Sequence, residues 1–87
     1  MKVGDIVTWK SQSSGTEKQK TGLVFAVISP GRDPSEAPII SQRRYNIMFG
    51  GNPRNHESYL ILVGGNERQY GALYWPRVKH LELVAEA

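Results

Sequence analysis

The residues of this chain best suited to chemistry are cationic and aromatic side chains that follow one another closely. Four such groups occur: Trp9-Lys10, Arg43-Arg44-Tyr45, Arg68-Gln69-Tyr70 and Tyr74-Trp75-Pro76-Arg77. Cationic side chains contact phosphates and aromatic rings stack on bases, and together they bind flexible nucleic acid. A small β domain also needs rings for its core. Of the adjacent rings of Tyr74 and Trp75, only one can face the core of a regular strand, so we expect the other at the surface beside Arg77.

These residues leave two binding functions open. In the first, the protein is a protein-interaction or assembly module that docks a protein partner or a second copy, as a homodimer. In the second, it binds nucleic acid through scattered cations and exposed rings. A third reading, a small-ligand or enzyme site in the pore of an oligomer, has the least support. The candidate binding residues are Trp9, Arg43, Arg44, Arg54, Arg68, Tyr74, Trp75, Arg77 and Lys79.

Side chains that could carry out catalysis are few. The eight carboxylates are scattered through predicted loops and chain ends, and the two histidines, His56 and His80, lie far apart in the sequence. Catalysis needs a nucleophile with a base, a carboxylate pair or a metal cluster, and zinc needs several closely spaced ligands. We therefore expect a non-enzymatic protein with no catalytic residue, no metal and no cofactor.

The composition is that of a globular protein. The 87 residues include no cysteine, 39% are hydrophobic and 22% are charged, and the net charge is +3. This charge is compatible with a polyanionic partner but does not require one. The segment after Met1 has no apolar stretch typical of a signal peptide, and no apolar run is long enough to span a membrane. We expect a single soluble, cytoplasmic domain over residues 1–87 that does not bind membranes.

Short apolar runs bounded by glycine and proline predict strands rather than helices. Val7 and Trp9 share one face of the first predicted strand, within residues 3–10. Polar residues predict long loops at 11–20 and 29–42. Further strands are expected at 21–28, 43–49 and 58–63, and at two short runs within 69–84.

The segment Pro76-Arg77-Val78-Lys79 separates the last two predicted strands. Proline ends the strand before it, and four residues suit a single 3₁₀ turn that brings Val78 inward. The sequence thus predicts an all-β fold of five to six antiparallel strands with a short 3₁₀ turn before the last strand.

A Gly-Gly-Asn-x-Arg pattern occurs twice, at residues 50–54 and 64–68. Glycine and asparagine adopt positive φ readily, so both copies are expected to be hairpin loops. A phosphate-binding loop of the P-loop type needs a helix after it, and strand-like sequence follows both copies. We expect the barrel end that carries these loops and the Tyr74-Trp75-Pro76-Arg77 segment to form the binding surface.

The order of these elements resembles that of SH3-like, KOW-type small β-barrels. The resemblance is carried by Val3-Gly4-Asp5-Ile6-Val7, by Thr21-Gly22-Leu23-Val24 and by the closing segment 78–84. It implies a small closed barrel, a fold that supports unrelated functions. Residues 59–63 add an apolar strand beyond the smallest such barrels, and this extra edge suits a homodimer.

Two further resemblances carry no activity. Residues 72–76 are loosely similar to a segment of small plasmid-borne type II dihydrofolate reductases, but only Pro76 matches, and Leu73 and Trp75 replace the ligand-contacting residues. The chain also loosely resembles short uncharacterised proteins of phages and mobile elements. Neither resemblance implies a substrate.

Overall fold

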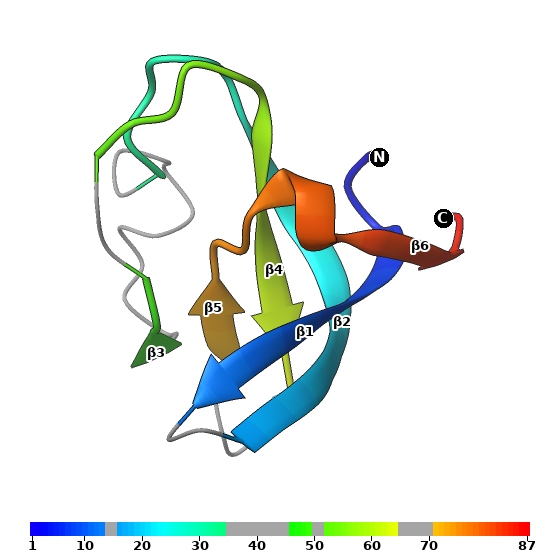
Figure 1. The fold of residues 1–87 in the computed structure, drawn as a ribbon. Coiled ribbons are helices and arrows are strands. Elements are labelled where there is room, and N and C mark those ends of the chain that lie inside the picture. The colour runs from blue at the N-terminus through cyan, green and yellow to red at the C-terminus, as the bar shows by residue number, and fades with distance from the viewer. Residues whose placement is uncertain (14–15, 35–45, 50–51, 65–70) are drawn as a thin grey trace.

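The protein forms one all-β sheet, described here from a computed structural model that covers residues 1–13, 16–34, 46–49, 52–64 and 71–87 (Figure 1). Its elements in chain order are β1 (Ile6–Ser13), β2 (Thr16–Ile28), β3 (Asn46–Ile47), β4 (Ser58–Val63), β5 (Ala72–Tyr74), the 3₁₀ turn η3 (Val78–His80) and β6 (Glu82–Ala85). The spatial order of the strands is β3-β5-β4-β2-β1-β6. The prediction of five antiparallel strands with a 3₁₀ turn before the last one is therefore confirmed, and β3 adds a short parallel pairing with β5.

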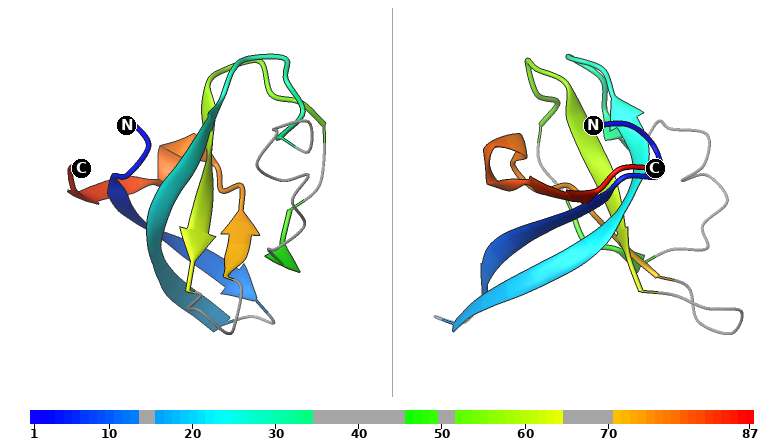
Figure 2. Two further views of the ribbon diagram at one scale, coloured as in Figure 1. Left: turned by 180° about the vertical axis from the view of Figure 1, so that it is seen from behind. Right: turned by 90° about the vertical axis from the view of Figure 1, so that its right-hand side faces the viewer.

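The prediction of a closed barrel is wrong. Strands β3 and β6 lie at opposite edges of the sheet, and in the described part of the chain no pairing joins them. The sheet is nevertheless strongly curved (Figure 2), and the long β2 pairs with β1 along its first part and with β4 along its second. A register shift between Val24 and Ala26 and another between Ile6 and Val7 add to this curvature, since bulges bend strands and increase their twist.

The predicted loop at 11–20 is instead part of a long hairpin. Strands β1 and β2 stay in register as far as the pair Ser13 and Thr16. Backbone pairing does not require apolar side chains, and polar contacts reinforce this hairpin. The Thr8 hydroxyl donates to the carbonyl of Lys20 at 2.7 Å and accepts from the Gln19 amide at 3.1 Å. The polar sequence of this segment concealed its strand character, because strand prediction relied on apolar alternation.

Two other predicted boundaries also shift. Residues 29–34 of the predicted loop at 29–42 contain no strand, and the rest of that loop lies outside the described residues. The strand predicted at 43–49 is described only as the two residues of β3. Residues 43–45 lie outside the described part, and Met48 and Phe49 are not in a strand.

No helix in the described ranges is long and apolar enough to cross a membrane.

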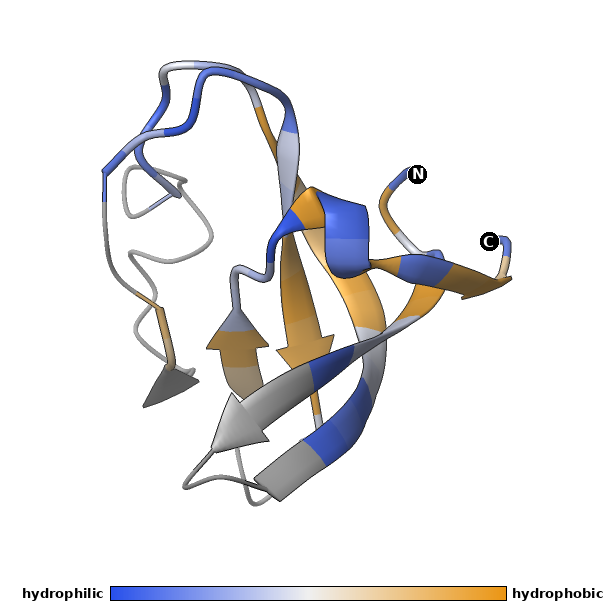
Figure 3. Ribbon diagram, viewed as in Figure 1, coloured by the Kyte–Doolittle hydropathy of each residue, from blue (hydrophilic) through white to orange (hydrophobic). Residues whose placement is uncertain are grey.

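Apolar side chains are buried on both faces of the sheet. In β4, Tyr59 and Ile61 point to one face and Leu60 points to the other, as strand alternation requires. Val78 of η3 packs against the first of the two clusters, which confirms the inward orientation predicted for it. The second half of β2 and most of β4 are accordingly coloured as hydrophobic, whereas two of the three residues of η3 are hydrophilic (Figure 3). The first cluster comprises Val7, Trp9, Val24, Tyr59, Ile61 and Leu81, and the second Ile28, Leu60 and Trp75.

The two Gly-Gly-Asn-x-Arg segments lie at opposite ends of β4 rather than at one end of a barrel. Arg54 precedes β4 and Gly64 follows it. Gly64 has a φ of 73°, as predicted for a hairpin loop, and β4 and β5 are antiparallel neighbours. The segment at 50–54 cannot be a simple hairpin loop, because β5 lies between β3 and β4.

Candidate functional site

An open groove lies at the end of the sheet where β4 begins and β5 ends. Because β4 and β5 are antiparallel, the residues before β4 and those after β5 meet at the same end of the sheet. The groove between them has a volume of about 810 Å³. It contains four of the nine candidate binding residues, namely Arg54, Trp75, Arg77 and Lys79. The remaining lining residues are Asn52, His56, Glu57 and Val78.

Arg54 joins the two sides of this groove. Its Nη1 donates a 2.8 Å hydrogen bond to the carbonyl of Pro76, and its Nη2 donates one of 2.6 Å to the carbonyl of Trp75. Its guanidinium carbon lies over the Trp75 ring, 3.9 Å from the ring centre. The backbone of the same residue is also held, since Gly31 donates its N–H to the Arg54 carbonyl at 2.7 Å. The orientation of the guanidinium is therefore set by the protein.

Trp75 is the anchor beneath Arg54. Its indole N–H donates to the Ser58 hydroxyl at 2.8 Å, and its ring meets Phe49 edge-to-face with centres 6.1 Å apart. Only 7% of its surface is exposed. The ring belongs to the second core cluster and cannot serve as an open stacking surface.

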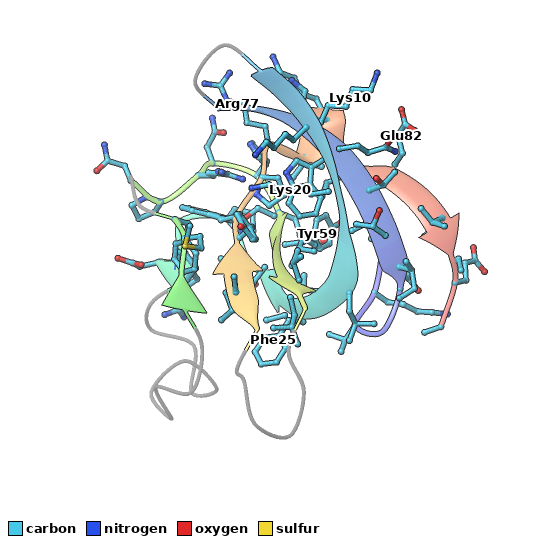
Figure 4. The ribbon with its side chains drawn as sticks, turned by 90° about the horizontal axis from the view of Figure 1, so that it is seen from below. Lys10, Lys20, Phe25, Tyr59, Arg77 and Glu82 are labelled. Atoms are coloured by element: carbon cyan, nitrogen blue, oxygen red, sulfur yellow. The ribbon has the colours of Figure 1, made fainter. Side chains whose placement is uncertain are left out.

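The groove carries an excess of positive charge. Arg77 and Lys79 are exposed, and Figure 4 shows Arg77 at the outside of the molecule. Burial lowers the pKa of Arg54 below its usual value, and the positive charge of Arg77 lowers it further, because the two guanidinium groups repel one another. Arg54 stays protonated, because arginine does not lose its proton in proteins. A bound anion would relieve this repulsion.

Glu57 is the one carboxylate among the described lining residues, and it already has a partner. The Tyr59 hydroxyl donates to its Oε1 at 3.0 Å. Burial raises the pKa of Tyr59 above 10.0, and this hydrogen bond raises it further. Tyr59 itself lies inside the curve of the sheet (Figure 4). Glu57 keeps its negative charge, but three cations line the groove against this one carboxylate, so the described lining has a net positive charge.

Trp9 and Tyr74 lie apart from the groove, in contact with the first core cluster. Their rings meet edge-to-face with centres 5.8 Å apart, and the ammonium group of Lys20 lies 4.1 Å from the centre of the Tyr74 ring. Trp9 is buried and Tyr74 is half-buried. The prediction that either Tyr74 or Trp75 is exposed is thus wrong, because each of the two sheet faces is covered by its own cluster.

The remaining candidates, Arg43, Arg44 and Arg68, lie outside the described residues. Sequence reasoning assigned no role to Ser58, which holds Trp75, or to His56, which lines the groove. Their contacts depend on which strands are neighbours, and no spacing in the sequence signals them. Within the described ranges, no three His, Asp or Glu side chains gather as metal ligands would.

Comparison of the chain with protein-family models, with curated proteins and with solved structures gave no match. These comparisons therefore identify no family for the chain. Any function must be argued from the groove itself.

Proposed function

We propose that the protein is a non-catalytic binding domain whose groove contacts single-stranded nucleic acid. The observation that carries this proposal is that Arg54, Arg77 and Lys79 line one groove although two chain segments supply them. A row of cations along an open groove suits the regularly spaced charges of a phosphate backbone. Asn52 and His56 provide further polar groups beside these cations.

Nucleic acid fits this groove better than an acidic protein does. Protein interfaces depend on exposed aromatic and apolar anchors at their centre, whereas Trp75 is buried and the half-buried Val78 packs against the core. The side chains most available to a ligand are the exposed cations Arg77 and Lys79. Charge attraction, rather than apolar burial, is therefore the main source of affinity.

The test is the binding of fluorescently labelled single-stranded DNA and RNA of mixed sequence, measured by anisotropy over a range of salt concentrations. Two phosphate contacts, from the exposed Arg77 and Lys79, predict a slope of about −1.4 for the logarithm of the binding constant against the logarithm of the salt concentration. Undetectable binding at low ionic strength would rule the proposal out. Binding that does not weaken with salt would contradict the electrostatic mechanism.

A second candidate is the assembly function, supported by the open edge of β6. All four residues of this strand are exposed, and Leu83 and Val84 expose 46% and 58% of their surfaces. Strand β6 pairs with β1 alone among the described strands, and an unpaired edge can add a strand from a second copy. Light scattering tests it: a dimer that L83K converts to a monomer would support assembly, and a monomer at all concentrations would oppose it.

A further inference from the structure

We infer that Arg54 receives a nucleobase by stacking rather than a phosphate, so that Trp75, Arg54 and the base form three successive layers. This inference rests on the proposed nucleic-acid function and specifies the part of the ligand that each cation binds. Arg77 and Lys79 contact phosphates of the strand. Arg54 contacts a base that lies between these phosphates.

The hydrogen bonds of Arg54 argue against a phosphate contact. An arginine grips phosphate best through two parallel N–H bonds from its planar fork. Here both terminal nitrogens of the fork already donate to the carbonyls of Trp75 and Pro76, at 2.6 and 2.8 Å. Reorienting the fork toward a phosphate would leave these two acceptors without their partner. Arg77 and Lys79 also line the groove but are exposed. Among the described residues, neither side chain makes hydrogen bonds like those that hold Arg54.

The remaining surface of Arg54 suits a base. The indole covers one side of the guanidinium, with the guanidinium carbon 3.9 Å from the ring centre. Arg54 is half-buried and lines the groove, so part of its side chain is open to a ligand there. Unstacked bases of single strands stack on arginine planes as they do on aromatic rings. Because the hydrogen bonds hold this plane still, stacking costs little side-chain entropy.

The buried rings strengthen this assignment. Trp9 and Trp75 are 5% and 7% exposed, so neither offers a base an open face. Among the described lining residues, the stacking surfaces left are the guanidinium plane over Trp75 and the exposed ring of His56, and two hydrogen bonds to backbone carbonyls fix the first of them. Trp75 contributes indirectly, by supporting the plane from below and being held in turn by Ser58.

The experiment compares a single-stranded oligonucleotide with an abasic strand of the same length and charge at one salt concentration. One stacked base predicts that wild-type protein binds the base-containing strand roughly five-fold to 100-fold more tightly. The R54K variant retains the positive charge but lacks the plane. We expect it to lose most of this preference while its salt dependence stays close to that of the wild type. R77A is the matched opposite, which should keep the preference and weaken the salt dependence.

A second measurement on wild-type protein locates the contact even if R54K does not fold. In NMR spectra, the Nε–H signal of Arg54 should shift when the base-containing strand is added and stay in place with the abasic strand. Equal affinity for the two strands, with the salt dependence intact, would overturn the stacking assignment and leave the proposed function standing. A shift of the Arg54 signal with both strands would assign Arg54 to the phosphates instead. Absence of binding to either strand would overturn both.

Discussion

The buried indole N–H of Trp75 donates a 2.8 Å hydrogen bond to the hydroxyl of Ser58, and this bond ties the first residue of β4 to the residue that follows β5. Both residues are buried, with 0% of the Ser58 surface exposed. The bond thus holds together the two segments that form the groove.

Substitution S58A removes the acceptor and leaves a buried indole N–H without a partner. We expect a loss of about 1–3 kcal/mol in the free energy of unfolding, measured by urea denaturation. The exposed Ser29 provides the matched control, because S29A should change stability by less than about 0.5 kcal/mol. Equal stability of S58A and wild type would show that this bond adds nothing to the fold.

The carboxylate of Asp5 makes the free energy of unfolding depend on pH in the acidic range. Its carboxylate accepts N–H bonds from Ala87 at 2.8 Å and Lys2 at 2.9 Å. These bonds hold the pKa of Asp5 below its usual 3.8, the bond from Ala87 having the larger effect. A carboxyl group with a lowered folded-state pKa stabilises the fold above its unfolded-state pKa, and that stability is lost as the pH falls through the folded-state value.

Thermal unfolding of D5N between pH 2 and pH 7 tests this role. At neutral pH we expect the variant to melt at a lower temperature than wild type. Below pH 3.8 the two melting temperatures should approach one another, because wild-type Asp5 becomes protonated as well. E82Q, which removes an exposed carboxylate, is the control. A constant difference between D5N and wild type across this range would contradict the proposed role of the Asp5 charge.

Gly22 is required by the close approach of β4 to β2. A Cβ atom at this position would lie 2.6 Å from both the Leu62 carbonyl oxygen and a methyl carbon of Ile61. The backbone oxygen cannot move without disturbing the sheet, so we expect G22A to destabilise the fold by about 1–3 kcal/mol, measured by urea denaturation. G64N is the comparison: Gly64 has a positive φ that asparagine tolerates and no atom within 4 Å of such a Cβ, so the loss should be smaller.

The exposed cations of the groove should set the salt dependence of nucleic-acid binding. We expect R77A to reduce the slope of the salt titration by about 0.7, since it removes one phosphate contact to a single strand, and K79A to act in the same direction. K18A removes the same charge from an exposed site that does not line the groove. Equal effects of K18A and R77A would mean that net charge, and not the groove, drives binding.

Much of the local structure could be predicted from residue order. The bounds of β4 agree with the predicted strand at 58–63, and the turn after Pro76 is 3₁₀. Val7 and Trp9 lie in one core cluster, as their alternation indicated. Apolar periodicity and turn residues encode these features locally, so they can be recognised without knowing which strands are neighbours.

The errors share a cause, because each depended on contacts between distant parts of the chain. Three features follow from how strands pair and which faces are covered: the polar half of the first hairpin, the open sheet, and the packing of both Tyr74 and Trp75 against core clusters. The candidate site shows the same division. Its cations could be picked out as residue types, but nothing in their spacing placed Arg54 over Trp75.

The sequence by itself determined that this protein is all-β and that a strand occupies residues 58–63. It also showed that cationic side chains are the residues best suited to bind a ligand. Only the tertiary structure decided that Arg54, Arg77 and Lys79 line one groove and that the indole of Trp75 lies under a guanidinium. The physical reason is the antiparallel pairing of β4 and β5. That pairing brings residues about twenty positions apart to the same end of the sheet, and alternation along either strand does not reveal it.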